Sequence, residues 1–290
     1  MRLSILLLAG GGTLALAGCA SSPSANSATA TAPAGTAVAS KVTPSPLKTK
    51  VAPAPKASFT PLPVHATGTA YQKGQAYLRT RHWSQALASF HTSIAHHQQV
   101  AASYAGIGEV EIGQGNFAAS EKAYSNAAKN QPNHAVYLYD AAYAALYNHD
   151  YHVAVSEATA YIKQKPKQAA GYHLRFLAYG DLLNRKKQLA DAATITRLQP
   201  SDAGAWNDLG IAQANDKHPQ KSIKAFGQAV RLSPRNPSYY MNRGLVQEEL
   251  LKNPKAALPD YEEARKLTTN KSSLQTLNKA IAALKGQIKH

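Results

Sequence analysis

Proline recurs along this chain at a fixed interval of 34 residues, at Pro132, Pro166, Pro200 and Pro234. A second column keeps the same interval and holds glycine, alanine or, once, phenylalanine: Gly74, Gly108, Ala142, Phe176, Gly210 and Gly244. A fixed period of this length is typical of stacked helix-turn-helix units, none of which can bury its apolar face alone. We therefore predict an all-α protein in which about six such units form a right-handed α-solenoid.

Each unit is taken to begin seven residues before its member of the second column, and the fifth unit shows the pattern most clearly. Its residues at the recurring positions are Trp206, Leu209, Gly210, Ser222, Phe226, Ala229 and Pro234. They resemble the tetratricopeptide repeat, which places a large residue, Leu-Gly, small residues, aromatics and proline at set offsets. The resemblance implies repeats over residues 66–270, with a concave groove lined by the first helix of each unit.

Small and large residues in the pattern indicate how the two helices of a unit pack. Small residues at positions such as Gly74 and Ala86 let the helices approach closely. Aromatic residues such as Phe90, Tyr124 and Phe226 fill the space against the next unit. The recurring proline ends the second helix and turns the chain toward the next unit.

The sixth unit is one residue longer than the others. Pro219 and Pro254, which we expect to open second helices, lie 35 residues apart. The recurring residues that follow, Ala257, Tyr261 and Ala264, also fall one residue late. The sequence therefore predicts a single inserted residue in the last unit.

Residues 271–290 have the pattern of one amphipathic helix. Their apolar residues recur at intervals of three and four, at Leu274, Leu277, Ile281, Leu284 and Ile288. We predict a capping helix that covers the last repeat, and a helix that binds a partner is the alternative.

The first 18 residues have the features of a secretory signal peptide. Arg2 precedes an apolar stretch that is too short to span a membrane as a helix. The residues Leu16-Ala17-Gly18-Cys19 resemble the bacterial lipobox. The resemblance implies cleavage before Cys19 and lipidation of that residue, and an ordinary signal peptide with an incidental cysteine is the alternative. Cys19 is the only cysteine, so an intramolecular disulfide is excluded.

Residues 19–65 are rich in alanine, serine, threonine and proline and show no apolar periodicity. Such a composition buries too little surface to offset the entropy of ordering, so we predict a disordered tether. A lipid anchor followed by a tether places the repeats in the bacterial cell envelope. Because Ala20 follows Cys19, where retention in the inner membrane often requires aspartate, we expect the periplasmic face of the outer membrane.

The resemblance to the tetratricopeptide repeat also implies which residues line the groove. The principal candidates are Tyr71, Gln75, Tyr139, Tyr143, Tyr147, His173 and Asn207, and Glu109 occupies a further groove position. Tyr139, Tyr143 and Tyr147 are spaced by four and so share one helix face. Tyrosine is favoured at interfaces because it joins apolar area to a polar tip. Two interpretations stay open: these tyrosines grip a peptide, or they pack against neighbouring units.

Basic residues are the second notable feature of the chain, whose formal net charge is +16. Several fall at expected turns between paired helices: Arg185, Lys186, Lys187, Lys217, Lys221, Lys252 and Lys255. A basic edge built from these turns attracts anionic lipid, glycan or acidic protein, and solvated lysines are the alternative. Nucleic acid is not an expected partner because the chain is predicted to be exported.

Motifs for catalysis or cofactor binding are missing from the sequence. We find no glycine-rich phosphate loop, no Gly-x-Ser-x-Gly and no His-Glu-x-x-His. His149 and His152 are three residues apart, but no cysteine or carboxylate set completes a metal site. We predict a protein that is not an enzyme and that needs no cofactor or metal.

These observations lead to one principal functional hypothesis and two alternatives. The principal hypothesis is a membrane-anchored scaffold of the cell envelope that binds a partner protein or peptide in its groove. One alternative is a lipoprotein for the assembly of pili or secretion pores, because the domain plan resembles such proteins. The other is an envelope adaptor that binds anionic glycan or lipid through the basic edge. The oligomeric state stays open.

Overall fold

The computed structural model describes residues 67–289, and this part of the chain is helical throughout, with no strand. The predictions for residues 1–65, including the lipidated Cys19 and the tether, lie outside the described residues. The described helices fall into two compact units, residues 67–198 and residues 199–289. Each unit is described by itself.

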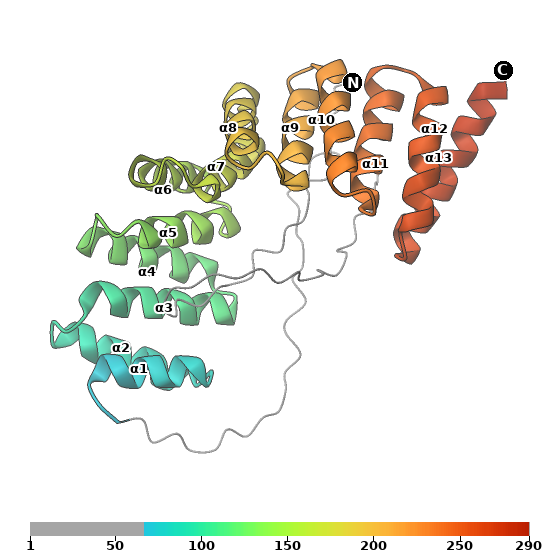
Figure 1. Ribbon diagram of the computed structural model, residues 1–290. Helices are drawn as coiled ribbons and strands as arrows, with labels where there is room; N and C mark the ends of the chain where they lie inside the picture. The colour runs from blue at the N-terminus through green and yellow to red at the C-terminus, as the bar shows by residue number, and fades with distance from the viewer. Residues whose placement is uncertain (1–66, 290) are drawn as a thin grey trace. The chain divides into compact units, whose positions relative to one another are not determined.

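The first unit consists of four helix pairs, and consecutive helices lie side by side (Figure 1). The pairs are α1 (Ala70–Arg79) with α2 (Trp83–Ala95), α3 (Val100–Gln114) with α4 (Phe117–Asn130), α5 (Ala135–Tyr147) with α6 (Tyr151–Gln164), and α7 (Ala169–Asp181) with α8 (Arg185–Leu198). The first helices of neighbouring pairs also touch, α1 against α3 and α5 against α7. We call this part of the chain the α1–α8 unit.

The second unit, the α9–α13 unit, contains two further pairs and a final helix. Its elements are α9 (Ala203–Asn215), α10 (Pro219–Leu232), α11 (Pro237–Leu245), the π-helical turn η1 (Val246–Leu250), α12 (Pro254–Leu267) and α13 (Lys271–Lys289). Together the described residues form six helix pairs and a last helix, which confirms the predicted fold class.

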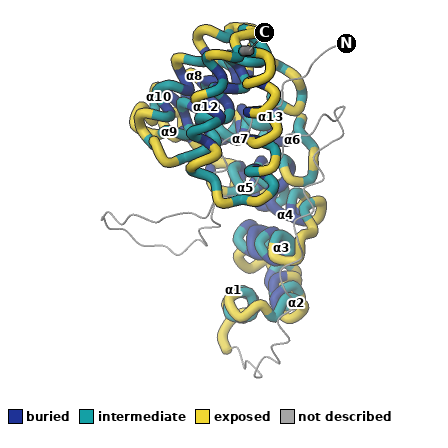
Figure 2. The backbone as a smooth tube through the Cα atoms, turned by 90° about the vertical axis from the view of Figure 1, so that its right-hand side faces the viewer, coloured by how far each residue is buried: buried dark blue, intermediate teal, exposed yellow. Residues whose placement is uncertain are grey.

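Aromatic side chains and glycines hold neighbouring helices together, as the sequence predicts. Phe90 of α2 is fully buried, and a Cβ atom placed on Gly74 of α1 would lie 2.6 Å from its ring. The same arrangement joins Phe226 of α10 to Gly210 of α9, at 2.7 Å. Figure 2 shows that buried residues gather where helices face each other. A side chain at either glycine would therefore separate the paired helices.

The turn between the two helices of each pair contains one residue in the left-handed backbone region. These residues have φ between +53° and +81° and are Arg81, Gly115, His149, Leu183, Lys217 and Lys252. They recur every 34 residues up to Lys217, and Lys252 follows after 35. Only one of the six is glycine, although an L-residue in this conformation costs roughly 1–2 kcal/mol. The fold therefore imposes the conformation without a sequence signal.

The inserted residue that the sequence predicts in the sixth repeat lies in η1. A π-helical turn holds one residue more than an α-helical turn, and these turns arise as single-residue insertions into α-helices. A recurring ion pair shows the shift: Arg175 of α7 pairs with Asp191, 16 residues later, whereas Arg243 of α11 pairs with Asp260, 17 residues later. The helix pairing survives because the extra residue is absorbed inside one turn.

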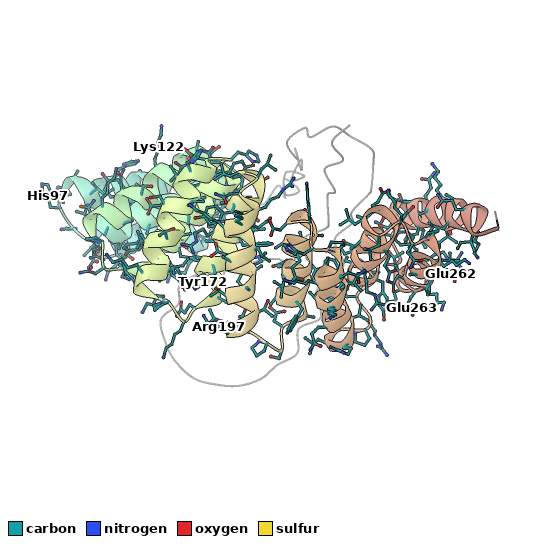
Figure 3. All side chains as sticks on the ribbon, turned by 90° about the horizontal axis from the view of Figure 1, so that it is seen from above. His97, Lys122, Tyr172, Arg197, Glu262 and Glu263 are labelled. Atoms are coloured by element: carbon teal, nitrogen blue, oxygen red, sulfur yellow. The ribbon has the colours of Figure 1, made fainter. Side chains whose placement is uncertain are left out.

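The last helix covers α12 with its apolar side. Leu277, Ile281 and Leu284 are buried against Ala257 and Tyr261, among others. At the rim, Lys285 Nζ lies 2.9 Å from a carboxylate oxygen of Glu262, which is labelled in Figure 3. The apolar side of α13 is thus occupied within the chain, as expected of a capping helix.

Among residues 67–289, no helix is long and apolar enough to cross a membrane.

Candidate functional site

The tyrosines of α5 form part of a continuous aromatic surface on the α1–α8 unit. The ring centroids of Tyr143 and Tyr147 are 4.6 Å apart. Tyr147 also stacks on Phe117, the first residue of α4, at 5.2 Å. Tyr147 keeps 43% of its surface exposed, which is unusual for a large aromatic side chain. We call Phe117, Tyr143 and Tyr147 the aromatic face.

Tyr139, one turn earlier on α5, has a different environment. Its ring lies 5.4 Å from that of Tyr161 on α6 and packs beside the buried Leu138 and Leu174. Burial, followed by the nearby charge of Asp140, raises the pKa of Tyr139 to about 12. Tyr139 therefore packs inside the unit, whereas Tyr147 presents its ring to solvent.

Two partly buried carboxyl groups lie close to each other, Glu109 on α3 and Asp140 on α5, and Asp140 also lies close to Tyr139. Burial and then the charge of Glu109 raise the pKa of Asp140 to about 7. Burial also raises the pKa of Glu109. Among the described residues, no lysine or arginine forms an ion pair with either carboxylate. The two carboxyl groups therefore retain a proton more readily than solvated carboxyls do, and they repel each other as two negative charges only above about pH 7, where Asp140 is ionised.

Sequence reasoning placed Glu109 in the groove but did not single out Asp140. For an aspartate in the middle of a helix, the sequence does not indicate whether the side chain is buried or exposed. The neighbouring tyrosines Tyr139 and Tyr143 were the available signal, because a residue beside packed side chains on one helix is itself close to the core.

The burial of Asp140 predicts a pH-dependent stability. Because its folded-state pKa lies above its ordinary value of 3.8, folding favours the protonated form. Its contribution to stability is present below pH ~4 and is lost as the pH rises through about 7. We expect Asp140→Asn to stabilise the α1–α8 unit by about 2–4 kcal/mol at pH 8 and by little at pH 4.

Urea unfolding at the two pH values measures this difference. Glu157→Gln is the comparison variant: burial also raises the pKa of Glu157, but the nearby charge of Lys129 opposes this shift, so its pH-dependent stabilisation should be smaller than that of Asp140→Asn. Equal effects of Asp140→Asn at pH 4 and pH 8 would show that the carboxylate does not change its protonation state on folding.

The other groove candidates of this unit lie on its first helices. On α1, Gln75 Nε2 donates a hydrogen bond to the Tyr71 hydroxyl at 3.3 Å, and the Tyr71 ring lies 6.0 Å from Phe90. On α7, His173 is half-buried and stacks near Phe176 at 6.1 Å. The structure therefore places these residues on α1, α5 and α7, with Tyr147 the most exposed of the tyrosines.

Asn207, the groove candidate on α9, is fully buried inside the other unit. Its side-chain oxygen accepts a hydrogen bond from Asn242 Nδ2 of α11 at 2.9 Å. A partner would have to separate α9 from α11 to reach it, so Asn207 is not part of the surface that we propose below.

The seven basic residues predicted to form an edge are all exposed. Arg185, Lys186 and Lys187 begin α8 in the α1–α8 unit, and Lys187 Nζ lies 5.4 Å from the centre of the Tyr179 ring. The others belong to the α9–α13 unit: Lys217, Lys221, Lys252 and Lys255. Lys252 lies 3.5 Å from Glu249. Each unit thus carries some of these residues in a turn between paired helices or in the first helical turn that follows it.

Within residues 67–289, no group of three or more histidine, cysteine or carboxylate side chains is arranged to hold a metal ion. His149 Nδ1 lies 2.9 Å from the hydroxyl of Tyr151.

Sequence comparisons match both units to one repeat family. The tetratricopeptide repeat model matches residues 71–136 and residues 207–271. A curated relative, small glutamine-rich tetratricopeptide repeat-containing protein 2 of Saccharomyces cerevisiae, is 25% identical over 131 residues. That alignment covers 45% of this chain and 33% of the relative, so the chain spans a third of the relative's length.

Solved structures show the same fold at low sequence identity. The C-terminal part of a repeat-containing protein from Cytophaga hutchinsonii has a TM-score of 0.64 at 14% identity, over 75% of this chain and 88% of that one. MamA from Desulfovibrio magneticus RS-1, from residue 41 to its end, has a TM-score of 0.55 at 22% identity, over 58% and 95%. YrrB, described as a tetratricopeptide protein with an unusual peptide-binding site, has a TM-score of 0.54 at 16% identity, over 64% and 96%.

The matched residues include the glycines and aromatic side chains that lock α1 to α2 and α9 to α10. Residues 71–136 and 207–271 therefore match the tetratricopeptide repeat model in sequence, and the helix pairs of this chain have the fold of solved tetratricopeptide repeat proteins.

Proposed function

We propose that this protein is a membrane-anchored scaffold of the bacterial cell envelope and that it binds a partner protein or peptide on the aromatic face of the α1–α8 unit. The main support for this position of the binding site is the exposure of Tyr147 beside Tyr143 and Phe117. Three aromatic rings in one surface give a large apolar area that loses little side-chain entropy on binding.

Asp140 precedes Tyr143 of the aromatic face by three residues on α5, and the charge there indicates the chemistry of the partner. Glu109 and Asp140 repel each other and have no cation from the described residues in an ion pair. A lysine or arginine of the partner would relieve this repulsion and would also be attracted to the faces of the tyrosine rings. We therefore expect a partner segment that carries a basic side chain.

The repeat fold supports the proposal by analogy. The solved structure of YrrB is described as containing a peptide-binding site, and it shares the fold of this chain. At 16% identity the site itself does not transfer, so the position proposed for binding rests on the residues of this chain alone.

The anchor and the location rest on the first 19 residues. The residues Leu16-Ala17-Gly18-Cys19 resemble a lipobox, and a lipid anchor would keep the repeats at a high effective concentration near partners in the same membrane. Labelling cells with radioactive palmitate tests the anchor, because label should enter the wild-type chain and be lost in Cys19→Ser. Label that persists in the variant would contradict it.

The binding proposal is tested by crosslinking intact envelopes and isolating the protein. We expect Tyr143→Ala/Tyr147→Ala to lower the recovery of one partner by about 30-fold or more, since tyrosines that a partner covers on binding are frequent hot spots. Tyr172→Ala on α7, labelled in Figure 3, is the matched control, and circular dichroism confirms that each variant is folded. A folded double variant that keeps every partner would remove the aromatic face as the binding site.

A further inference from the structure

The turn between α7 and α8 carries the most exposed large apolar side chain in the described part of the chain. Leu183 keeps 73% of its surface in contact with solvent. The other exposed large apolar residues within residues 67–289 are Val136 at 39%, Tyr147 at 43% and Leu232 at 38%. Leu183 therefore exposes far more apolar surface than packing at a helix turn requires.

The turn itself gives no reason for a leucine at this position. Leu183 has φ of +56°, in the left-handed region that branched and bulky side chains disfavour. The five equivalent turn positions in the other helix pairs hold arginine, glycine, histidine or lysine: Arg81, Gly115, His149, Lys217 and Lys252. The fold thus accepts polar residues or glycine there, and Leu183 adds both backbone strain and apolar exposure.

Three cations follow the leucine directly. Arg185, Lys186 and Lys187 form the first turn of α8, and all three are exposed. The backbone N–H of Lys187 is held by the side-chain oxygen of Asn184 at 3.4 Å, which fixes where this turn of the helix begins. Asp181, at the end of α7, is the acid closest in sequence, so the turn keeps a net positive charge.

An exposed apolar tip beside a cluster of cations matches the surface of an anionic bilayer. The leucine gains by entering the acyl region, and the cations gain at the phosphate groups of the lipids. An anionic glycan or an acidic polypeptide would satisfy the cations but would leave Leu183 in water. The leucine therefore distinguishes a membrane from other anionic partners.

We propose that the α7–α8 turn dips into an anionic membrane, with Leu183 among the acyl chains and Arg185, Lys186 and Lys187 at the headgroup phosphates. This contact is separate from the aromatic face, although it rests on the proposed location of the protein at a membrane. It would add a second, reversible attachment to the lipid anchor and would restrain the α1–α8 unit against the bilayer.

Vesicle sedimentation tests the contact, using the full chain with Cys19→Ser in every protein so that no lipid anchor contributes. We expect binding to vesicles that contain phosphatidylglycerol and weaker binding to pure phosphatidylcholine. Leu183→Gly should lower the partition coefficient about tenfold. The same variant should raise the melting temperature, because glycine adopts the left-handed conformation without strain. Leu232→Ser, another partly exposed leucine, is the control and should bind as the wild type does.

Two further readouts separate insertion from simple charge attraction. Arg185→Ala/Lys186→Ala/Lys187→Ala should abolish the preference for phosphatidylglycerol. Leu183→Trp should be quenched by lipids with brominated acyl chains more strongly than the wild type, whose own tryptophans are Trp83 and Trp206.

Wild-type binding by Leu183→Gly would overturn the proposal, and so would an unquenched Leu183→Trp. If the triple variant alone loses binding, and heparin competes equally with wild type and Leu183→Gly, the turn binds anionic polymers through charge only. Either failure leaves the aromatic face untouched, because partner capture through Tyr143 and Tyr147 is measured with the same Leu183→Gly protein.

Discussion

Arg243→Ala is expected to destabilise the α9–α13 unit by about 3–5 kcal/mol, because it leaves a buried carboxylate without its cation. Asp260 is only 5% exposed. Arg243 Nε donates to one oxygen of Asp260 at 2.8 Å, and Nη2 donates to the other at 2.6 Å. This two-fold contact joins α11 to α12, so its loss weakens the packing of the two helices that η1 connects.

Urea unfolding measured by Trp206 fluorescence, in a Trp83→Phe background, reports on this unit alone because Trp206 lies on α9. Lys266→Ala is the control: it breaks the ion pair of Lys266 with Glu263, whose side chains are 67% and 37% exposed. Exposed pairs contribute up to about 1 kcal/mol. A loss for Arg243→Ala no larger than that of Lys266→Ala would show that Asp260 does not depend on its partner.

Phe90→Ala is expected to destabilise the α1–α8 unit by about 3–5 kcal/mol. The Phe90 ring is fully buried, and it fills space next to Gly74 of α1 and Gly106 of α3. Neither glycine has a side chain that can move into the cavity, so the loss should lie near the upper part of the range for large-to-small substitutions.

Fluorescence of Trp83 in a Trp206→Phe background measures the unfolding of this unit, since Trp83 begins α2. His91→Ala, an exposed neighbour of Phe90, is the control and should change stability by no more than about 0.5 kcal/mol. Adding Gly74→Ala to Phe90→Ala should recover part of the loss, because the new methyl group occupies the vacated space. A further loss in the double variant would contradict the proposed packing.

The period of the sequence was enough to predict the helix pairs and the contacts that lock them. Glycine at position 74 and phenylalanine at position 90 predict one packing arrangement, because glycine leaves space between the two helices and the phenylalanine ring occupies that space. The single inserted residue was also visible as a register shift between Pro219 and Pro254. Its form, the π-helical turn η1, was not, since a bulge and a longer loop produce the same shift.

Backbone conformation in the turns could not be predicted in this way. Five of the six left-handed residues carry side chains, so the usual glycine signal exists only at Gly115. The packing of the paired helices fixes the left-handed backbone conformation of the turn residue, and five of the six turns keep this conformation despite its strain. Leu183 is the clearest case, because neither its conformation nor its exposure follows from its identity.

The candidate site was predictable in part. Spacing by four correctly placed the tyrosines on one helix, but it did not distinguish Tyr139, which packs on Tyr161, from the exposed Tyr147. Position within the repeat also assigned Asn207 to a surface, where the structure shows a buried hydrogen bond to Asn242. Both differences arise from neighbouring helices, which a positional pattern does not contain.

The most direct test of the account is site-specific photocrosslinking in cells that produce the protein. A benzoylphenylalanine at position 147 lies on the aromatic face, and one at the exposed Lys163 of α6 lies on a second helix of the same unit. The account predicts a covalent adduct with a single partner from position 147, lost in the presence of Tyr143→Ala, and no such adduct from position 163. The same adducts from both positions, or none from position 147, would contradict it.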